Sequence, residues 1–216
     1  LAQRGEQTQA RAMLAPLVDL AGADAGSVSA IAAVYADVGD SVRARALLRA
    51  ALARERQPSA GLLLQYAGLL LRLGGSDADF ANAMQSLRAM PLDAAQRRQH
   101  EDLQRGHGLR QAEALRQRGE LALAYEALRP LLAATPNDPL VLGALARMYV
   151  DAGNQGEAVR LYERILSRSP NDLDTLRAAG GAASAAGDLG TAERLFQRAL
   201  QIAPDDPQTL AALGNI

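Results

Sequence analysis

The side chains that could carry metal chemistry are few, and their spacing does not suit it. His100 and His107 are the only histidines, and they lie seven residues apart on one predicted helix, roughly 10.5 Å along its axis. Two metal ligands on one helix are normally three or four residues apart, and only Leu, Gln and Arg stand at those distances from either histidine. The chain also has no cysteine, which excludes thiolate ligands and disulfides. We therefore expect surface histidines and no metal site.

Other catalytic patterns are missing from the sequence as well. The glycines do not form a phosphate-binding loop after a strand. Ser and Asp residues stand at predicted helix starts, where their oxygens accept hydrogen bonds from free backbone N–H groups. We predict a protein that is not an enzyme and that has no cofactor.

Charged and amide side chains on predicted first helices form the more informative pattern. The candidate binding residues are Glu113, Arg116, Gln117, Arg147, Asp151, Asp174 and Arg177, with Val150 and Ser184 on the same face. Their guanidinium groups can bind carboxylates or sugar hydroxyls. The alternative is a solvated face with local pairs such as Arg147–Asp151, each adding only about a few tenths of a kcal/mol.

A repeated segment positions these residues. Three stretches align without gaps, with turn glycines at Gly119, Gly153 and Gly187 and alanines at Ala124, Ala158 and Ala192, each step being 34 residues. This period and these residue types are typical of the tetratricopeptide repeat (TPR), a pair of antiparallel helices. The predicted fold is all-α: a right-handed superhelical solenoid in which the first helix of each repeat lines the inner wall.

The period divides the chain into two blocks and a joint. The N-terminal block, 1–91, contains a half repeat over 1–24, a full repeat over 25–58 and a degenerate repeat over 59–91. Gly74 and Gly119 are 45 residues apart, 11 more than one period, so 92–118 is predicted as an over-long helix or hinge, bent at Gly106 and Gly108. The C-terminal block, 105–216, contains repeats 105–138, 139–172 and 173–206 and a partial repeat, 207–216. Such a chain is expected to be a piece of a longer solenoid.

Composition limits the partners. The formal net charge is −1, so nucleic acid is not an expected partner, and the longest apolar run is too short to insert into a membrane. Aromatic residues make up 3% of the chain and Trp is absent, so any glucan contact should be weak. Tyr35, Tyr149 and Tyr162 fall on packing positions, whereas the positions of Tyr66 and Tyr125 leave their roles open.

The stretch "LRQAEALRQRGELALAYEALRPLLAATPNDPLVLGALARMYVDAGNQGEAVRLYERILSRSPND", with the preceding "LLLQYAGLLLRLGG", resembles the TPR region of the bacterial cellulose synthase operon protein C family. The resemblance rests mainly on residues 59–170. It implies a periplasmic solenoid that precedes an outer-membrane β-barrel and takes part in cellulose export. The implied partners are proteins of a cellulose synthase complex, with glucan or peptidoglycan as further contacts.

These observations lead to one main hypothesis and two alternatives. The first is a non-enzymatic periplasmic scaffold, part of an outer-membrane protein, that supports exopolysaccharide export by linking the inner-membrane synthase to the outer-membrane pore. The second is a TPR protein-interaction adaptor unrelated to polysaccharide. The third is a regulatory arm of an enzyme.

Overall fold

The computed structural model describes residues 9, 12–13, 25–74 and 77–216. Throughout these residues the regular structure is helical, with eleven helices and no strand, so the predicted all-α solenoid fold is confirmed. The half repeat predicted over 1–24 lies largely outside the described residues. The chain divides into two compact units, Leu1–Gly106 (unit 1) and His107–Ile216 (unit 2). Each is described by itself.

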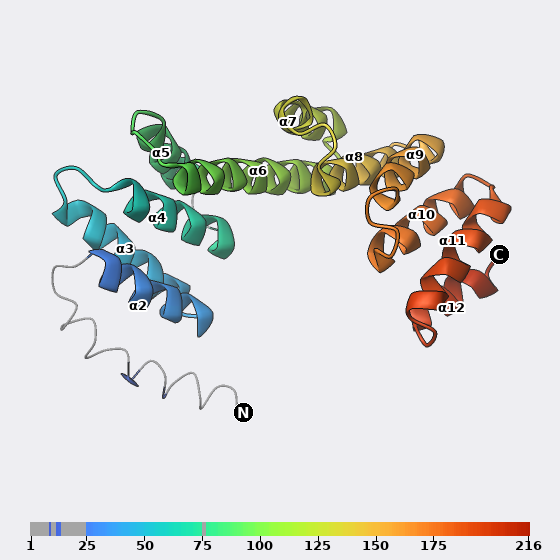
Figure 1. The fold of residues 1–216 in the computed structure, drawn as a ribbon, viewed down its shortest axis with the longest axis horizontal. Coiled ribbons are helices and arrows are strands. Elements are labelled where there is room, and N and C mark those ends of the chain that lie inside the picture. The colour runs from blue at the N-terminus through green and yellow to red at the C-terminus, as the bar shows by residue number, and fades with distance from the viewer. Residues whose placement is uncertain (1–8, 10–11, 14–24, 75–76) are drawn as a thin grey trace. The chain divides into compact units, whose positions relative to one another are not determined.

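Unit 1 consists of two helix pairs followed by the first half of a long helix (Figure 1). The elements are α2 (Ala25–Asp37), α3 (Ser41–Arg54), α4 (Ala60–Leu73), α5 (Asp77–Arg88) and the start of α6 (Ala94–Gln117). Asp40 caps α3 by accepting a hydrogen bond from the Arg43 N–H at 3.2 Å, and Ser59 caps α4 by accepting from Leu62 N–H at 3.3 Å. These caps fix where each helix begins.

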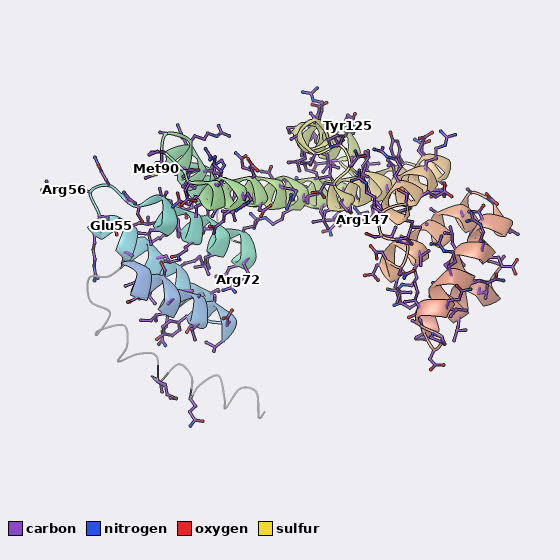
Figure 2. The ribbon with its side chains drawn as sticks, in the orientation of Figure 1. Glu55, Arg56, Arg72, Met90, Tyr125 and Arg147 are labelled. Carbon is purple, nitrogen blue, oxygen red and sulfur yellow. The ribbon has the colours of Figure 1, made fainter. Side chains whose placement is uncertain are left out.

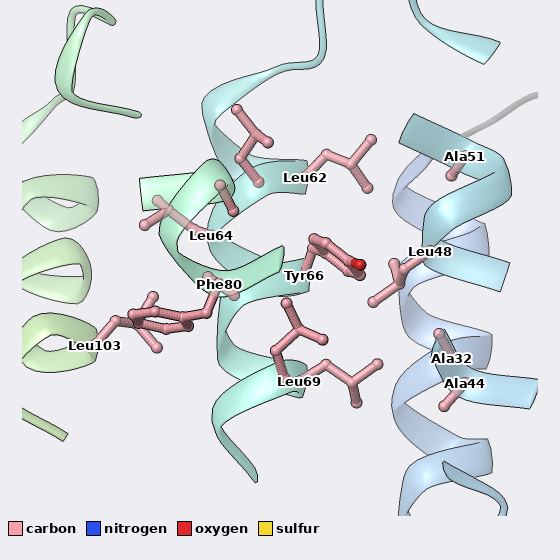
Figure 3. Packing of buried hydrophobic residues seen from close by; sticks show 14 of the residues in the cluster. Ala32, Ala44, Leu48, Ala51, Leu62, Leu64, Tyr66, Leu69, Phe80 and Leu103 are labelled. Atoms are coloured by element: carbon pink, nitrogen blue, oxygen red, sulfur yellow. The ribbon is translucent and has the colours of Figure 1, made fainter. Parts of the chain in front are cut away.

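The core of unit 1 contains both small and large buried side chains. Ala32 and Ala44 are fully buried where α2 and α3 meet, which lets the two helices approach closely. Tyr66 of α4 points towards Leu48 of α3, whereas Phe80 and Leu103 pack on the other side of α4 (Figure 3). The sequence left Tyr66 undecided; in the structure it is a buried packing residue.

Unit 2 follows the 34-residue period closely. Its helices are the end of α6, α7 (Leu121–Ala134), α8 (Pro139–Asp151), α9 (Gln155–Leu166), α10 (Leu173–Ala185), α11 (Leu189–Ile202) and α12 (Pro207–Gly214). The three turn glycines have φ between 77° and 80°, a left-handed conformation that other residues rarely adopt. The three periodic alanines on α7, α9 and α11 are all fully buried, as the repeat pattern predicts.

Helix α6 has 24 residues, whereas the described helices on either side have 12 to 14. It runs without interruption through Gly106 and Gly108, the two glycines at which the sequence predicted a bend. A Cβ atom at Gly106 would lie 2.8 Å from Leu71 of α4, and one at Gly108 would lie 2.9 Å from Leu131 of α7. The glycines therefore serve close packing of α4 and α7 against α6.

Candidate functional site

The end of α6 and the end of α8 bring five of the predicted binding residues together. The Arg116 guanidinium donates to both carboxylate oxygens of Glu113, at 3.0 Å and 2.7 Å, and also pairs with Asp151 of the next repeat. The Gln117 amide donates to Glu113 at 2.9 Å. Arg147 Nε lies 3.7 Å from Glu113. The spacing of about one repeat between Arg116 and Asp151 lets one ion pair bridge neighbouring first helices.

Two groups of this cluster, Glu113 and Arg116, have strongly shifted pKa values. Hydrogen bonds from the Arg116 guanidinium lower the pKa of Glu113 from 4.5 to about 2, although partial burial acts in the opposite direction. Hydrogen bonding to Glu113 raises the pKa of Arg116 in turn. Both groups therefore remain charged at neutral pH, and Arg116 is held in place mainly by its own carboxylate partners.

A groove of about 280 Å³ opens beside the cluster. Arg116, Arg147, Val150 and Asp151 line one part of it, and the face of α10 that carries Ala178, Gly181, Ala182 and Ala185 forms another. A Cβ atom at Gly181 would meet nothing within 4 Å, so the α10 backbone is accessible there. We call this space the unit 2 groove.

Arg147, labelled in Figure 2, is the more exposed of the two arginines that line this groove. Its side chain is 50% exposed, whereas that of Arg116 is only 20% exposed. In the part of the chain that the structure describes, its one ion pair is the long contact with Glu113. The guanidinium can therefore bind an anion or a hydroxyl without breaking a strong internal pair.

The groove is also lined by Tyr162 and Gln155, two polar residues that the sequence analysis did not single out as binding residues. Tyr162 was predicted to pack, and it is 4% exposed, with burial raising the pKa of its hydroxyl. The Gln155 amide donates to the Val150 carbonyl at 3.2 Å, but its buried Oε1 has no hydrogen-bond partner among the described residues. The sequence signal for Gln155 was its position two residues after the turn glycine Gly153, at the start of α9.

Asp174 and Arg177 form a separate cluster and do not line the unit 2 groove. Arg177 pairs with Asp174, donates to Gln208 at 2.9 Å and lies 3.2 Å from Asp206, the residue that caps α12. A hydrogen bond from the Thr209 hydroxyl is the main cause that lowers the pKa of Asp206. Arg177 is thus committed to the junction of α10 and α12, and Ser184 is half-buried on α10.

The histidines occupy α6, where both are half-buried, so the expectation of surface residues was wrong. Among the described residues, no group of three or more metal-ligating side chains comes together.

Tyr149 packs against the core of unit 2 while partly buried, as predicted, whereas Tyr125 on α7 is 43% exposed (Figure 2).

Unit 1 contains a counterpart of the Arg116–Asp151 bridge that sequence reasoning missed. Arg72 Nη1 lies 2.8 Å from Asp37 Oδ1, and Arg72 Nη2 donates to the Ala33 carbonyl at 3.4 Å. The signal was the spacing of opposite charges, since both Asp37–Arg72 and Arg116–Asp151 are separated by 35 residues.

None of the described helices is long and apolar enough to cross a membrane.

Comparison with known proteins identifies the repeats and a group of similar chains. A family model of the tetratricopeptide repeat matches residues 115–180 and 149–216 and indicates a scaffold fold, not a catalytic family. Cellulose synthase operon protein C of Pseudomonas fluorescens is 32% identical over 161 residues, which is 74% of this chain and 12% of that protein. The protein of the same name from Xanthomonas axonopodis pv. citri is 39% identical over 138 residues, 64% of this chain and 9% of that protein.

The fold is shared with solved structures of low sequence identity. PilW, a type IV pilus biogenesis factor, has a TM-score of 0.65 at 22% identity, covering 97% of this chain and 92% of that one. A likeness at this level of identity shows the fold alone.

Proposed function

This chain is a tetratricopeptide-repeat protein, and from that premise we propose that it is a non-enzymatic scaffold in bacterial cellulose export. The proposed place is the periplasm, in a solenoid that links the inner-membrane synthase to the outer-membrane pore. The observation that carries the proposal is the similarity to cellulose synthase operon protein C over three quarters of the chain. Since the chain spans only about a tenth of those relatives, their role comes to it as a proposal.

The unit 2 groove supports a role in binding a protein partner. Arg147 offers an accessible guanidinium, the buried Gln155 Oε1 lacks a donor among the described residues, and the α10 face around Gly181 has room for a backbone. A polypeptide segment with a carboxylate meets all three requirements, because it brings an anion, N–H donors and a thin main chain.

A glucan or peptidoglycan strand is the weaker fit to this groove. Its hydroxyls would satisfy Arg147 and Gln155, but Tyr162 is the one aromatic residue of the lining and it is buried. A sugar ring therefore finds no open aromatic face on which to stack. We propose protein as the main partner and glycan contacts as secondary.

A segment exchange tests the proposal. In Pseudomonas fluorescens, the stretch of cellulose synthase operon protein C that matches this chain would be deleted or replaced by it, and secreted cellulose would be measured. We expect the deletion to abolish secretion and the replacement to restore most of it. A replacement that accumulates folded in the periplasm but secretes no cellulose would contradict the proposal and favour an adaptor unrelated to polysaccharide.

A further inference from the structure

The outer side of α7 differs from the matching sides of α9 and α11, the second helices of the following repeats. Six positions on this side recur with the 34-residue period. On α9 and on α11 five of the six residues are polar or charged, whereas on α7 four of the six are apolar. We call these six residues of α7, all of them exposed, the α7 face: Ala122, Leu123, Glu126, Arg129, Pro130 and Ala133.

The α7 face points away from the core of its own unit. Ala124 and Leu128, on the other side of the helix, are fully buried. Leu123 is the largest apolar side chain of the face and is 56% exposed, and Tyr125, which flanks the face, is 43% exposed (Figure 2). Apolar side chains gathered on the exposed side of a helix mark a surface on which another element can pack.

Pro130 releases this face from a role in joining the repeats. The corresponding residues of α9 and α11 are Arg164 and Arg198, and each donates a hydrogen bond to a carbonyl of the preceding linker. Proline has neither a cation nor an N–H group, so α7 cannot form that bond. The side chains of the α7 face are therefore available for a contact outside the repeat.

The charges of the α7 face are balanced and lie near its centre. Glu126 and Arg129 are the only charged residues of α7; they form an ion pair at 3.2 Å, with side chains 54% and 69% exposed. A second copy of α7 that runs in the opposite direction would place each Glu126 against the Arg129 of the other copy. A parallel copy would bring like charges together. Helix α3 also exposes alanines, but it contains four arginines and no acidic residue, so two copies of α3 would repel each other.

We propose that two copies of this chain associate by antiparallel pairing of their α7 faces. Around a two-fold axis, Leu123 of each copy packs against Pro130 of the other, and Ala122 packs against Ala133. The occupant is a second copy because both the charges and the small side chains of the face match their own reversed order. One helix face covers less than the roughly 1,600 Å² of a standard interface, so the association is weak. The unit 2 groove, whose lining includes no residue of α7, stays open in both copies.

Sedimentation equilibrium of the full chain tests the association. We expect the mean mass to rise from that of a monomer towards that of a dimer, with a dissociation constant on the order of 100 μM. Leu123→Ser should weaken the association at least about tenfold, since it removes the largest apolar side chain of the contact. Leu189→Ser is the control, because Leu189 is also exposed, at 46%, but lies on α11. It should associate like the parent.

A charge exchange tests the antiparallel register. Glu126→Arg gives each copy two arginines at the contact and Arg129→Glu gives each copy two glutamates, so each variant alone should associate at least about fivefold more weakly. An equimolar mixture should form a mixed dimer with about the affinity of the parent, because each arginine then faces a glutamate. The control is the same exchange on α9, Glu157→Arg and Arg160→Glu, which breaks an ion pair of the same spacing and should leave the association unchanged.

Three outcomes would overturn the proposal. They are a parent chain that stays monomeric at about 1 mM, α9 variants that weaken the association as much as the α7 variants do, and a mixture that associates no more tightly than either α7 variant alone. The last would show that the contact lies on another face. None of the substituted residues lines the unit 2 groove, so this proposal can fail while the export proposal stands.

Discussion

Two adjacent glycines of α10, Gly180 and Gly181, differ in how much room their surroundings leave for a side chain. A Cβ atom at Gly180 would lie 2.7 Å from the Phe196 ring of α11, whereas one at Gly181 would meet nothing within 4 Å. Phe196 is 3% exposed and packs with Ala183 and Ala192, so its ring has little freedom to move. Gly180 is required by packing, but Gly181 is not.

The two alanine variants should therefore change stability in opposite directions. We expect Gly180→Ala to lower the free energy of unfolding by about 1–3 kcal/mol through overpacking. Gly181→Ala should raise it by about 0.5–1 kcal/mol, because alanine has the higher helix propensity. Urea denaturation of both variants measures the difference, and equal effects would mean that Phe196 adjusts to the added methyl group.

Glu113, which pairs with Arg116 beside the unit 2 groove, makes the stability of unit 2 depend on pH. Its pKa is lowered in the folded state, from 4.5 to about 2, so its ion pair adds stability above pH 4.5. That contribution is lost as the pH falls through about 2. Glu113→Gln should therefore cost more stability at pH 7 than at pH 2. A carboxyl titration by nuclear magnetic resonance that finds an ordinary pKa for Glu113 would contradict the arrangement.

At the scale of the helix, arginines on second helices connect consecutive repeats. Arg164 of α9 donates to the Pro136 carbonyl at 3.1 Å, and Arg198 of α11 donates to the Pro170 carbonyl at 2.9 Å. Both the arginines and the prolines are 34 residues apart, so the same bond recurs with the period. It satisfies a carbonyl in the linker between helices that no helical hydrogen bond reaches.

Removing this bond should weaken the contact between repeats. We expect Arg164→Ala to lower the free energy of unfolding by about 1 kcal/mol, since it also loses the 2.9 Å bond to Asn137. Arg160→Ala is the control, because Arg160 is 74% exposed and, among the residues that the structure describes, pairs only with Glu157 in its own helix. Its cost should stay below about 0.5 kcal/mol. Equal costs in thermal denaturation would show that the linker bonds add nothing.

The sequence predicted elements better than it predicted contacts between them. Turn glycines and buried alanines follow a local period, so the helices of unit 2 and their buried faces could be derived from residue types alone. Arg177 shows the limit. It shares a helix face with the groove positions, but its partner is set by the rotation between repeats, which brings Asp206 within 3.2 Å. The role of Gly106 likewise required the position of Leu71.

At the scale of the whole molecule, the boundary between the two units falls inside α6, at Gly106–His107. The sequence places its over-long helix or hinge in the same segment, and we retain that joint as a prediction. In a solenoid each repeat contacts only its neighbours, so a block with several stacked pairs can be stable without the rest.

The isolated segment 107–216 should therefore fold by itself. It retains the buried clusters around Ala124, Ala158 and Phe196 and all the residues of the unit 2 groove. We expect a helical circular-dichroism spectrum with a cooperative thermal transition. A segment that remains unfolded would show that unit 2 depends on contacts from residues 1–106.

We propose that the solenoid groove around Arg147 serves cellulose export. The most direct measurement is the cellulose secreted by Pseudomonas fluorescens cells whose cellulose synthase operon protein C carries this chain in place of its matching stretch. Arg147→Ala should reduce secretion severalfold at equal periplasmic protein level, and Arg160→Ala should leave it unchanged. Full secretion with Arg147→Ala, or an equal loss with both variants, would contradict the claim.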